Sequence, residues 1–248
     1  MRILVCNDDG IDAPGIAVLE KVAQMITDDV WVVAPDRKCT AASGSITLGR
    51  PLTMVEHSKR RYSCSGTPAD CVLTAMTWLF GGTSKPDLVI SGINDGRNVA
   101  EDLIYSGTLG IAREATFWGV PAIGFSRVKN FDQLPGDQQW LSEFVSTIWA
   151  AREKWFVEGH WLSVNLPTSL PAPISQPRIG RDKIGRSAEI VSTEGSITTI
   201  ILPRGRGHDA TDGDDNDLLD KGTVCINRLN WFGETRVGTD LLTPLFDL

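Results

Sequence analysis

Two adjacent aspartates, Asp8 and Asp9, directly follow the first apolar segment of the chain. That segment, residues 3–6, is short and partly β-branched, which predicts a buried strand, and Asn-Asp-Asp-Gly after it is typical of a loop. Open α/β sheets bind ligands at the carboxyl ends of their strands. Neighbouring carboxylates repel each other unless a cation lies between them. The pair therefore indicates either a cation site or a polar strand end with both acids in water.

Two further polar clusters follow predicted strands. Residues 39–45, which include Thr40, come after an apolar strand at 30–35, and Asn94 ends a strand at 87–94. Because the carboxyl ends of parallel strands share one edge of a sheet, these clusters are expected to converge with the aspartates. Carboxylate, hydroxyl and amide oxygens suit magnesium, manganese or calcium and are poor ligands for zinc.

A phosphate-binding feature accompanies these oxygen ligands. Ser106, Gly107 and Thr108 begin a predicted helix, where free backbone N–H groups favour an anion, and Asn98 is placed to donate a further hydrogen bond. Alone, this pattern indicates only a helix cap. Together with a cation site, it predicts metal-assisted phosphate chemistry. The sequence contains neither a GxxxxGK[ST] loop nor a glycine-rich dinucleotide fingerprint after the first strand.

The elements that position these residues follow a strand–helix–strand order. Helices are expected from Asp12 as N-cap, at 67–80 with Thr67 and Asp70 as a capping box, at 106–119 and at 138–156. Further strands are expected at 120–126, 161–167 and 223–229, with a hairpin at 189–202. This order predicts an α/β fold with a mostly parallel, doubly wound sheet, divided into a core at 1–170 and a C-terminal extension at 171–248.

Composition restricts the class of protein. The 248 residues carry a formal net charge of −7, which argues against binding to nucleic-acid duplexes or anionic membranes. No apolar run is long enough to span a bilayer, and the first residues do not resemble a signal peptide. Five scattered cysteines suit a reducing cytoplasm. The acidic run at 212–217 lacks the spacing of a calcium loop and predicts a solvated turn.

Histidine and tryptophan are not expected to do the chemistry. The three histidines are too few for a histidine-based metal site, and His208 is assigned to an exposed basic loop. Tryptophans could stack on a nucleobase, but their helix and strand positions favour core or subunit contacts. The tryptophans concerned are Trp140, Trp149, Trp155 and Trp161.

At these motifs the sequence closely resembles the SurE family of survival-protein nucleotidases. The resemblance is carried by "MRILVCNDDGIDAPGI", "VVAPDRKCTAASGSITL", "GTPADCV", "PDLVISGINDGRN" and "DLIYSGT", and it spans the first two-thirds of the chain. It implies a Rossmann-like α/β core and a divalent-metal-dependent phosphatase of nucleoside monophosphates. It also implies a cytoplasmic homodimer or homotetramer held together by C-terminal elements.

The family's site residues carry over by position. By resemblance, the ligands of one divalent metal ion per subunit are Asp8, Asp9, Thr40 and Asn94. The residues that would hold the phosphate are Asn98, Ser106, Gly107 and Thr108. Magnesium or manganese is the expected ion, with calcium a further option in a crystal.

Four positions depart from the family's pattern. Thr40 stands where the family usually has serine, and Cys39 replaces a usual arginine, which removes a positive charge near the site. Asn227 and Arg228 replace a threonine–proline pair, and the tail that follows is short.

The leading hypothesis is hydrolysis of a phosphate monoester by a metal-activated water, with Asp8 and Asp9 on the metal and Asp9 as candidate proton acceptor. Two alternatives stay open. One is a covalent aspartyl-phosphatase, and the other is a non-enzymatic, cation-dependent phosphate or nucleotide sensor. The preferred nucleotide, activity on 3′-nucleotides or polyphosphate and the physiological metal are left open by the sequence.

Overall fold

The computed structural model describes residues 1–129, 136–181, 187–202 and 210–233. The strands are β1 (Arg2–Cys6), β2 (Asp29–Pro35), β3 (Met54–Ser58), β4 (Arg61–Cys64), β5 (Leu88–Asp95), β6 (Ala122–Arg127), β7 (His160–Leu166), β8 (Ile174–Ser175), β9 (Glu189–Glu194), β10 (Ile197–Ile201) and β11 (Val224–Asn230). The helices are α1 (Pro14–Gln24), α2 (Pro68–Thr74), a π-helical turn η1 (Ala75–Leu79), α3 (Asp102–Tyr105), α4 (Gly107–Phe117), α5 (Gln138–Ala150), α6 (Arg152–Trp155) and α7 (Asp215–Asp220).

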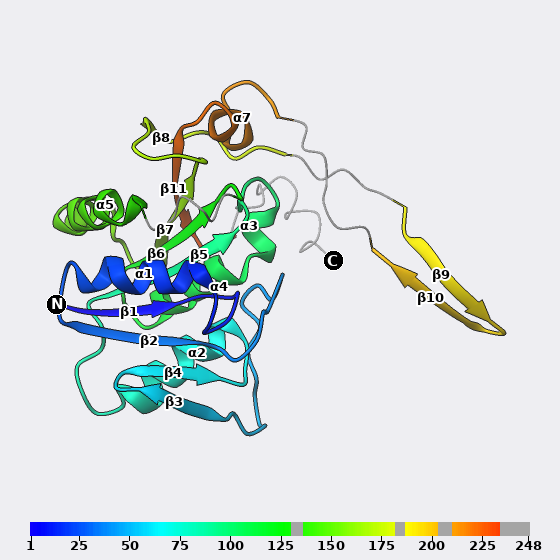
Figure 1. Ribbon diagram of the computed structural model, residues 1–248, viewed down its shortest axis with the longest axis horizontal. Coiled ribbons are helices and arrows are strands. Elements are labelled where there is room, and N and C mark those ends of the chain that lie inside the picture. The colour runs from blue at the N-terminus through cyan, green and yellow to red at the C-terminus, as the bar shows by residue number, and fades with distance from the viewer. Residues whose placement is uncertain (130–135, 182–186, 203–209, 234–248) are drawn as a thin grey trace, which may run out of the picture.

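One nine-stranded sheet organises the chain, in the order β3-β4-β2-β1-β5-β6-β7-β11-β8 (Figure 1). The six strands from β4 to β7 run parallel to their neighbours. Antiparallel pairs, β3 with β4 and β11 with β7, flank this parallel centre. The predicted α/β fold with a mostly parallel sheet is confirmed, and the carboxyl ends of β1, β2 and β5 share one edge.

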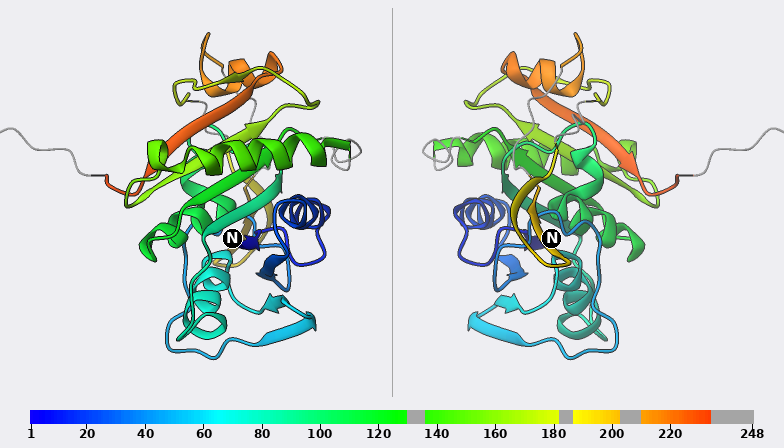
Figure 2. Two further views of the ribbon diagram at one scale, coloured as in Figure 1. Left: turned by 90° about the vertical axis from the view of Figure 1, so that its left-hand side faces the viewer. Right: turned by 90° about the vertical axis from the view of Figure 1, so that its right-hand side faces the viewer.

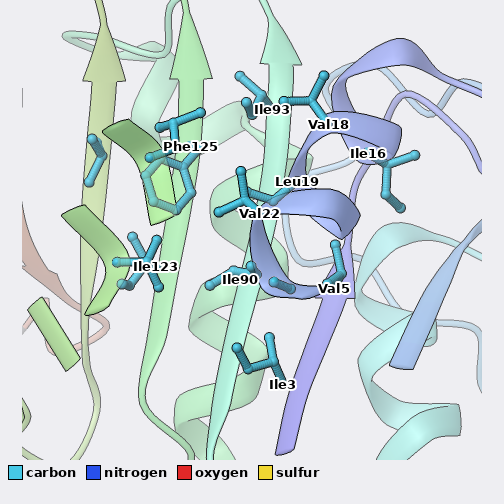
Figure 3. Packing of buried hydrophobic residues seen from close by; sticks show 14 of the residues in the cluster. Ile3, Val5, Ile16, Val18, Leu19, Val22, Ile90, Ile93, Ile123 and Phe125 are labelled. Atoms are coloured by element: carbon cyan, nitrogen blue, oxygen red, sulfur yellow. The ribbon is translucent and has the colours of Figure 1, made fainter. Parts of the chain in front are cut away.

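Alternating side chains of β1 explain why helices cover both faces of the sheet. Ile3 and Val5 belong to the apolar cluster that includes residues of α1 and α5, whereas Leu4 and Cys6 belong to the cluster that includes residues of α2 and α4. Figure 3 shows the first cluster, and Figure 2 shows α1 and α2 on opposite sides of the sheet. Because both faces are buried, the central strands are mostly apolar, as parallel strands generally are.

Two helix starts match their predictions. Thr67 Oγ1 accepts from Asp70 N at 3.2 Å, and an Asp70 carboxylate oxygen accepts from Thr67 N at 2.8 Å, which completes the capping box of α2. Ser106 Oγ accepts from Leu109 N at 3.1 Å and caps α4. The expected role of Asp12 was wrong. Ala13 is the N-cap of α1 without a side-chain bond, and Pro14 at the first helical position has no N–H to cap.

Two other features differ from the expectations, and one agrees with them. The edge strand β3 and its neighbour β4 were not predicted, because their residues are mostly polar and lack clear alternation. The long helix expected at 138–156 is two helices, α5 and α6, separated by Ala151. The tryptophans at 155 and 161 are buried, as expected for core residues.

The acidic run at 212–217 is not a solvated turn. Asp214 and Asp215 are 2% and 1% exposed, and Asp214 is the N-cap of α7, accepting from Asp217 N at 2.8 Å. Asp215 accepts from the backbone N–H groups of Ala100 and Gly180 at 2.8 and 2.9 Å. The sequence pattern misled because acidic residues are usually exposed, whereas here backbone donors satisfy them inside the fold.

The C-terminal region contributes both to the sheet and to a separate hairpin. β11 pairs with β7 and β8 pairs with β11, so residues beyond 170 extend the main sheet, while the division at 170 stays a prediction. The hairpin expected at 189–202 is confirmed as β9 and β10, which project away from the sheet (Figure 1). His208 lies outside the described residues. Within them, no helix has the length and apolar character that crossing a membrane requires.

Candidate active site

Residues from four separate segments line one cavity of about 220 Å³ at the carboxyl edge of the sheet. Those that were predicted as site residues are Asp8, Asp9, Thr40, Asn94, Asn98 and Ser106. The cavity also includes Lys38, Ala41, Asp95, Asp102 and Tyr105. The structure thus brings together side chains up to 98 positions apart, through the end of β1, the loop after β2, the end of β5 and the start of α4.

Asp8 lines this cavity and is only 6% exposed. The Thr108 hydroxyl donates to Asp8 Oδ1 at 2.6 Å. Burial raises the pKa of the Asp8 carboxyl to about 6, and the hydrogen bond from Thr108 partly opposes this rise. A Cβ on Gly107 would lie 2.8 Å from Asp8 Cβ, so only glycine allows the helix to approach this closely. The first turn of α4 is therefore built directly against Asp8.

Asp9 has two different partners. Its Oδ1 forms an ion pair with Lys38 Nζ at 2.5 Å, and its Oδ2 accepts from the backbone N–H of Asp95 at 3.1 Å. The hydrogen bond from the ammonium to Asp9 raises the pKa of Lys38, and the nearby charges of Asp9, Asp95 and Asp8 add to this effect. The side chain of Asp9 is therefore oriented by the end of β5, and the positively charged ammonium of Lys38 lies beside it.

Thr40 and Asn94 supply the neutral oxygens. The backbone N–H of Cys39 donates to the Asp8 carbonyl at 2.7 Å, which holds the loop carrying Thr40 against the end of β1. Asn94 Nδ2 donates to the Gly96 carbonyl at 2.8 Å. This bond leaves the Asn94 side-chain oxygen as the atom that can ligate a cation.

Asn98 and the start of α4 carry the hydrogen-bond donors that were predicted to bind an anion. Asn98 is 7% exposed, and its Nδ2 donates to Ser126 Oγ at 2.7 Å, so one amide hydrogen is used and the second can reach a ligand. Ser106 Oγ is engaged as the N-cap. Thr108 is fully buried and its hydroxyl faces Asp8, not the cavity. What Gly107 and Thr108 offer an anion is therefore their backbone N–H groups at the positive end of the helix.

The loop at 36–49 is tied to the start of α2. Asp70, the capping residue of α2, also accepts from Thr47 N at 2.8 Å through its second oxygen. Thr67 donates its hydroxyl to the Ser45 carbonyl at 2.5 Å. These bonds fix the far end of the loop that presents Lys38 and Thr40.

The donor set fits a divalent cation that prefers oxygen. In the part of the chain that the structure describes, no group of three His, Cys, Asp or Glu side chains is placed to hold a metal ion. A cation here would therefore depend on the Thr40 hydroxyl and the Asn94 amide as well as on the two carboxylates. Asp95 Oδ1 is buried without a hydrogen-bond partner among the described residues, so it is a further oxygen atom of a cavity-lining residue that a ligand could contact.

Sequence reasoning missed Lys38 and Asp95. Both had a signal, because Lys38 lies two residues before Thr40 and Asp95 directly follows Asn94. With Asp9, they also border a second, adjoining cavity of about 350 Å³. The remaining lining of that cavity is Gly10, Ile11, Asp12, Ala13, Pro14, Gly15, Asp36 and Arg37.

Known proteins resemble this chain in sequence and in structure. The family model described as "Survival protein SurE" matches residues 3–188. A protein of Paramagnetospirillum magneticum named 5'-nucleotidase SurE is 41% identical over 191 residues, which cover 75% of this chain and 72% of that protein. A Brucella canis protein of the same name is 35% identical over 236 residues, covering 92% and 90%.

A solved structure resembles the whole chain. The crystal structure of the SurE protein from Aquifex aeolicus superimposes with a TM-score of 0.79 at 27% sequence identity. It covers 100% of this chain and 98% of that one. The likeness therefore includes the C-terminal region as well as the parallel sheet.

Proposed function

This chain belongs to the survival protein SurE family, and on that premise we propose that it hydrolyses nucleoside monophosphates with a divalent cation. The observation that carries the proposal is the cavity itself. Two carboxylates, a hydroxyl and an amide line it beside the start of α4. Similar proteins that are 35–49% identical are named 5'-nucleotidase SurE, which supports a phosphate monoester of a nucleoside as the substrate.

Asp8, Asp9, Thr40 and Asn94 would hold the cation. When bound, it neutralises charge on the phosphoryl oxygens and lowers the pKa of water, so that water becomes a nucleophile near neutral pH. Asp8 is suited to this role because burial disfavours its ionised form unless a positive charge is nearby. Magnesium or manganese is the ion that these hard oxygen ligands favour.

The other residues bind and orient the phosphoryl group. The N–H groups of Gly107 and Thr108 and the second amide hydrogen of Asn98 donate to its oxygens, where charge accumulates during the reaction. Hydrolysis forms a bond between the water oxygen and phosphorus and breaks the ester bond, and the leaving oxygen takes up a proton. We assign Asp9, which lines the cavity, as the acceptor of the proton that the attacking water loses. The adjoining cavity of about 350 Å³ offers room for the nucleoside.

The direct test is release of phosphate from a nucleoside monophosphate with Mn²⁺, with and without a chelator. We expect turnover that the chelator abolishes, and a loss of about 1,000-fold or more in Asp8→Asn and Asp9→Asn. Asp28→Asn is the matched control, because Asp28 is exposed and precedes β2 at the opposite edge of the sheet. Near-normal turnover in either site variant would contradict the assignment. Phosphorylation of one aspartate during turnover would favour a covalent phosphatase. Phosphorylation without turnover would favour a sensor.

We also propose that a second copy of the chain covers the β9–β10 hairpin. Its apolar side chains are strongly exposed, with Ile190 at 71% and Ile197 at 69%. An isolated two-stranded hairpin is marginally stable in water, so an exposed apolar one needs a partner surface. The mass in solution should therefore be that of a dimer or tetramer, and Ile190→Lys with Ile197→Lys should lower it. A monomeric wild-type protein would contradict this proposal.

A further inference from the structure

Lys38 has a contact that the proposed reaction does not yet use. Its Nζ lies 2.5 Å from Asp9 Oδ1, although the lysine side chain is 52% exposed and that of Asp9 only 9%. A half-exposed lysine that lines the cavity thus contacts a nearly buried carboxylate of the same cavity. The backbone that carries it is the loop after β2, which also presents Thr40.

The charges around the cavity make this ammonium important. Four carboxylates line the cavity, those of Asp8, Asp9, Asp95 and Asp102, and Lys38 is the one basic side chain among the described residues that do so. A phosphate monoester carries up to two negative charges near neutral pH. One divalent cation leaves such a site with excess negative charge, so an additional positive group on the substrate side lowers the cost of binding.

The position of Lys38 suits contact with the substrate. It lines both the cavity at the start of α4 and the adjoining cavity of about 350 Å³, together with Asp9 and Asp95. A phosphoryl group held at α4, with its leaving group in the adjoining cavity, would therefore pass beside Lys38. The four-carbon stem of lysine is flexible, and its strongly hydrated ammonium can exchange one oxygen partner for another.

We propose that Lys38 is a substrate-binding residue that exchanges partners. In the metal-free protein its ammonium pairs with Asp9. When a divalent cation binds Asp9, the ammonium moves to a phosphoryl oxygen of the bound monoester. This inference rests on the proposed function, since it requires both the cation and the phosphate to bind in this cavity.

The exchange makes opposite predictions for the two ligands. Without phosphate, Lys38 competes with the cation for Asp9, so Lys38→Gln should bind Mn²⁺ about fivefold to tenfold more tightly than the wild type. With Mn²⁺ saturating, the same variant should bind inorganic phosphate about tenfold more weakly, because it lacks the charged donor. A lysine that served only as an ion-pair partner of Asp9 would, when replaced, tighten Mn²⁺ binding but leave the phosphate affinity unchanged.

The experiment measures Mn²⁺ binding by electron paramagnetic resonance and phosphate binding by calorimetry on the full-length chain. Lys38→Arg keeps the charge and should retain most of the phosphate affinity. Lys21→Gln is the matched control, because it removes the same charge from an exposed position in the last turn of α1. It should behave as the wild type does.

The outcomes separate the two proposals. If the wild type binds Mn²⁺ and phosphate but Lys38→Gln shows unchanged phosphate affinity, the role of Lys38 is wrong and the proposed function stands. If Lys38→Gln binds Mn²⁺ no more tightly than the wild type does, the proposed exchange of partners at Asp9 is wrong. A loss of phosphate affinity in Lys38→Arg as large as in Lys38→Gln would show that charge is not the cause. If the wild type binds no Mn²⁺, the proposed function and this inference both fail.

Discussion

Two of the chain's pairs of adjacent aspartates do different work, Asp8–Asp9 and Asp214–Asp215. Burial alone does not distinguish them, because it raises the pKa of both Asp8 and Asp215. Their partners do. Asp214 and Asp215 accept chiefly from backbone N–H groups, whereas Asp8 and Asp9 accept mainly from the side chains of Thr108 and Lys38.

This difference in hydrogen-bond donors shows what an acidic pair needs in order to bind a ligand. Backbone donors cannot leave without unfolding the local chain, so the second pair is committed to the structure. Side-chain donors can rotate away, and the first pair faces a cavity. The same two residues in sequence are thus structural in one place and available for a cation in the other.

The largest expected contrast is in stability. Asp215→Ala leaves the N–H groups of Ala100, Gly180 and Asn216 without their acceptor, so the free energy of unfolding should fall by about 3 kcal/mol. Asp212→Asn is the control, because the Asp212 side chain is 96% exposed and its ion pair with Lys221 is screened by solvent, so the substitution should change stability little. Urea unfolding measures both. Equal effects would show that the backbone contacts of Asp215 are not important for stability.

The pH dependence of stability tests the first pair, through Asp8. Because the pKa of Asp8 is raised to about 6, the folded protein holds this proton more tightly than the unfolded chain does. Metal-free protein should therefore lose about 3 kcal/mol of stability, relative to Asp8→Asn, as the pH rises from about 4 to about 7. Saturating Mn²⁺ should restore it, since the cation stabilises the ionised form. Parallel pH profiles for the two metal-free proteins would contradict the raised pKa.

The smallest expected effect concerns Thr40. Thr40→Ser keeps the hydroxyl and should bind Mn²⁺ within about threefold of the wild type, whereas Thr40→Val keeps the shape without the oxygen and should bind at least about tenfold more weakly. Titration of Mn²⁺ on both variants measures this difference. If valine binds as well as serine does, the Thr40 hydroxyl is not a ligand.

Much of the fold was predictable because its signals are local. Apolar runs identified β1, β2, β5, β6 and β7, and the capping residues Thr67 and Ser106 identified the starts of α2 and α4. The convergence of Asp8, Asp9, Thr40 and Asn94 followed from the shared edge of parallel strands. What the sequence could not supply were features that depend on contacts between distant segments.

Two residues illustrate that limit. The ion pair between Lys38 and Asp9 joins positions 29 residues apart, and no local pattern marks it. The burial of Asp215 depends on donors at Ala100 and Gly180, so its acidic neighbourhood looks like solvent-exposed chain until the fold is known. In both cases tertiary hydrogen bonding decided the outcome against the usual preference of charged residues for water.

The double role of Asp70 couples two motions that would otherwise be independent. One of its carboxylate oxygens accepts from Thr67 N in the capping box of α2. The other accepts from Thr47 N in the loop that presents Thr40. Release of that loop therefore also frays the helix, so the amide protons of Thr47 and Thr67 should exchange with deuterium in a single opening event. A helix end that contributes no side chain to the cavity is in this way tied to the loop that presents Thr40.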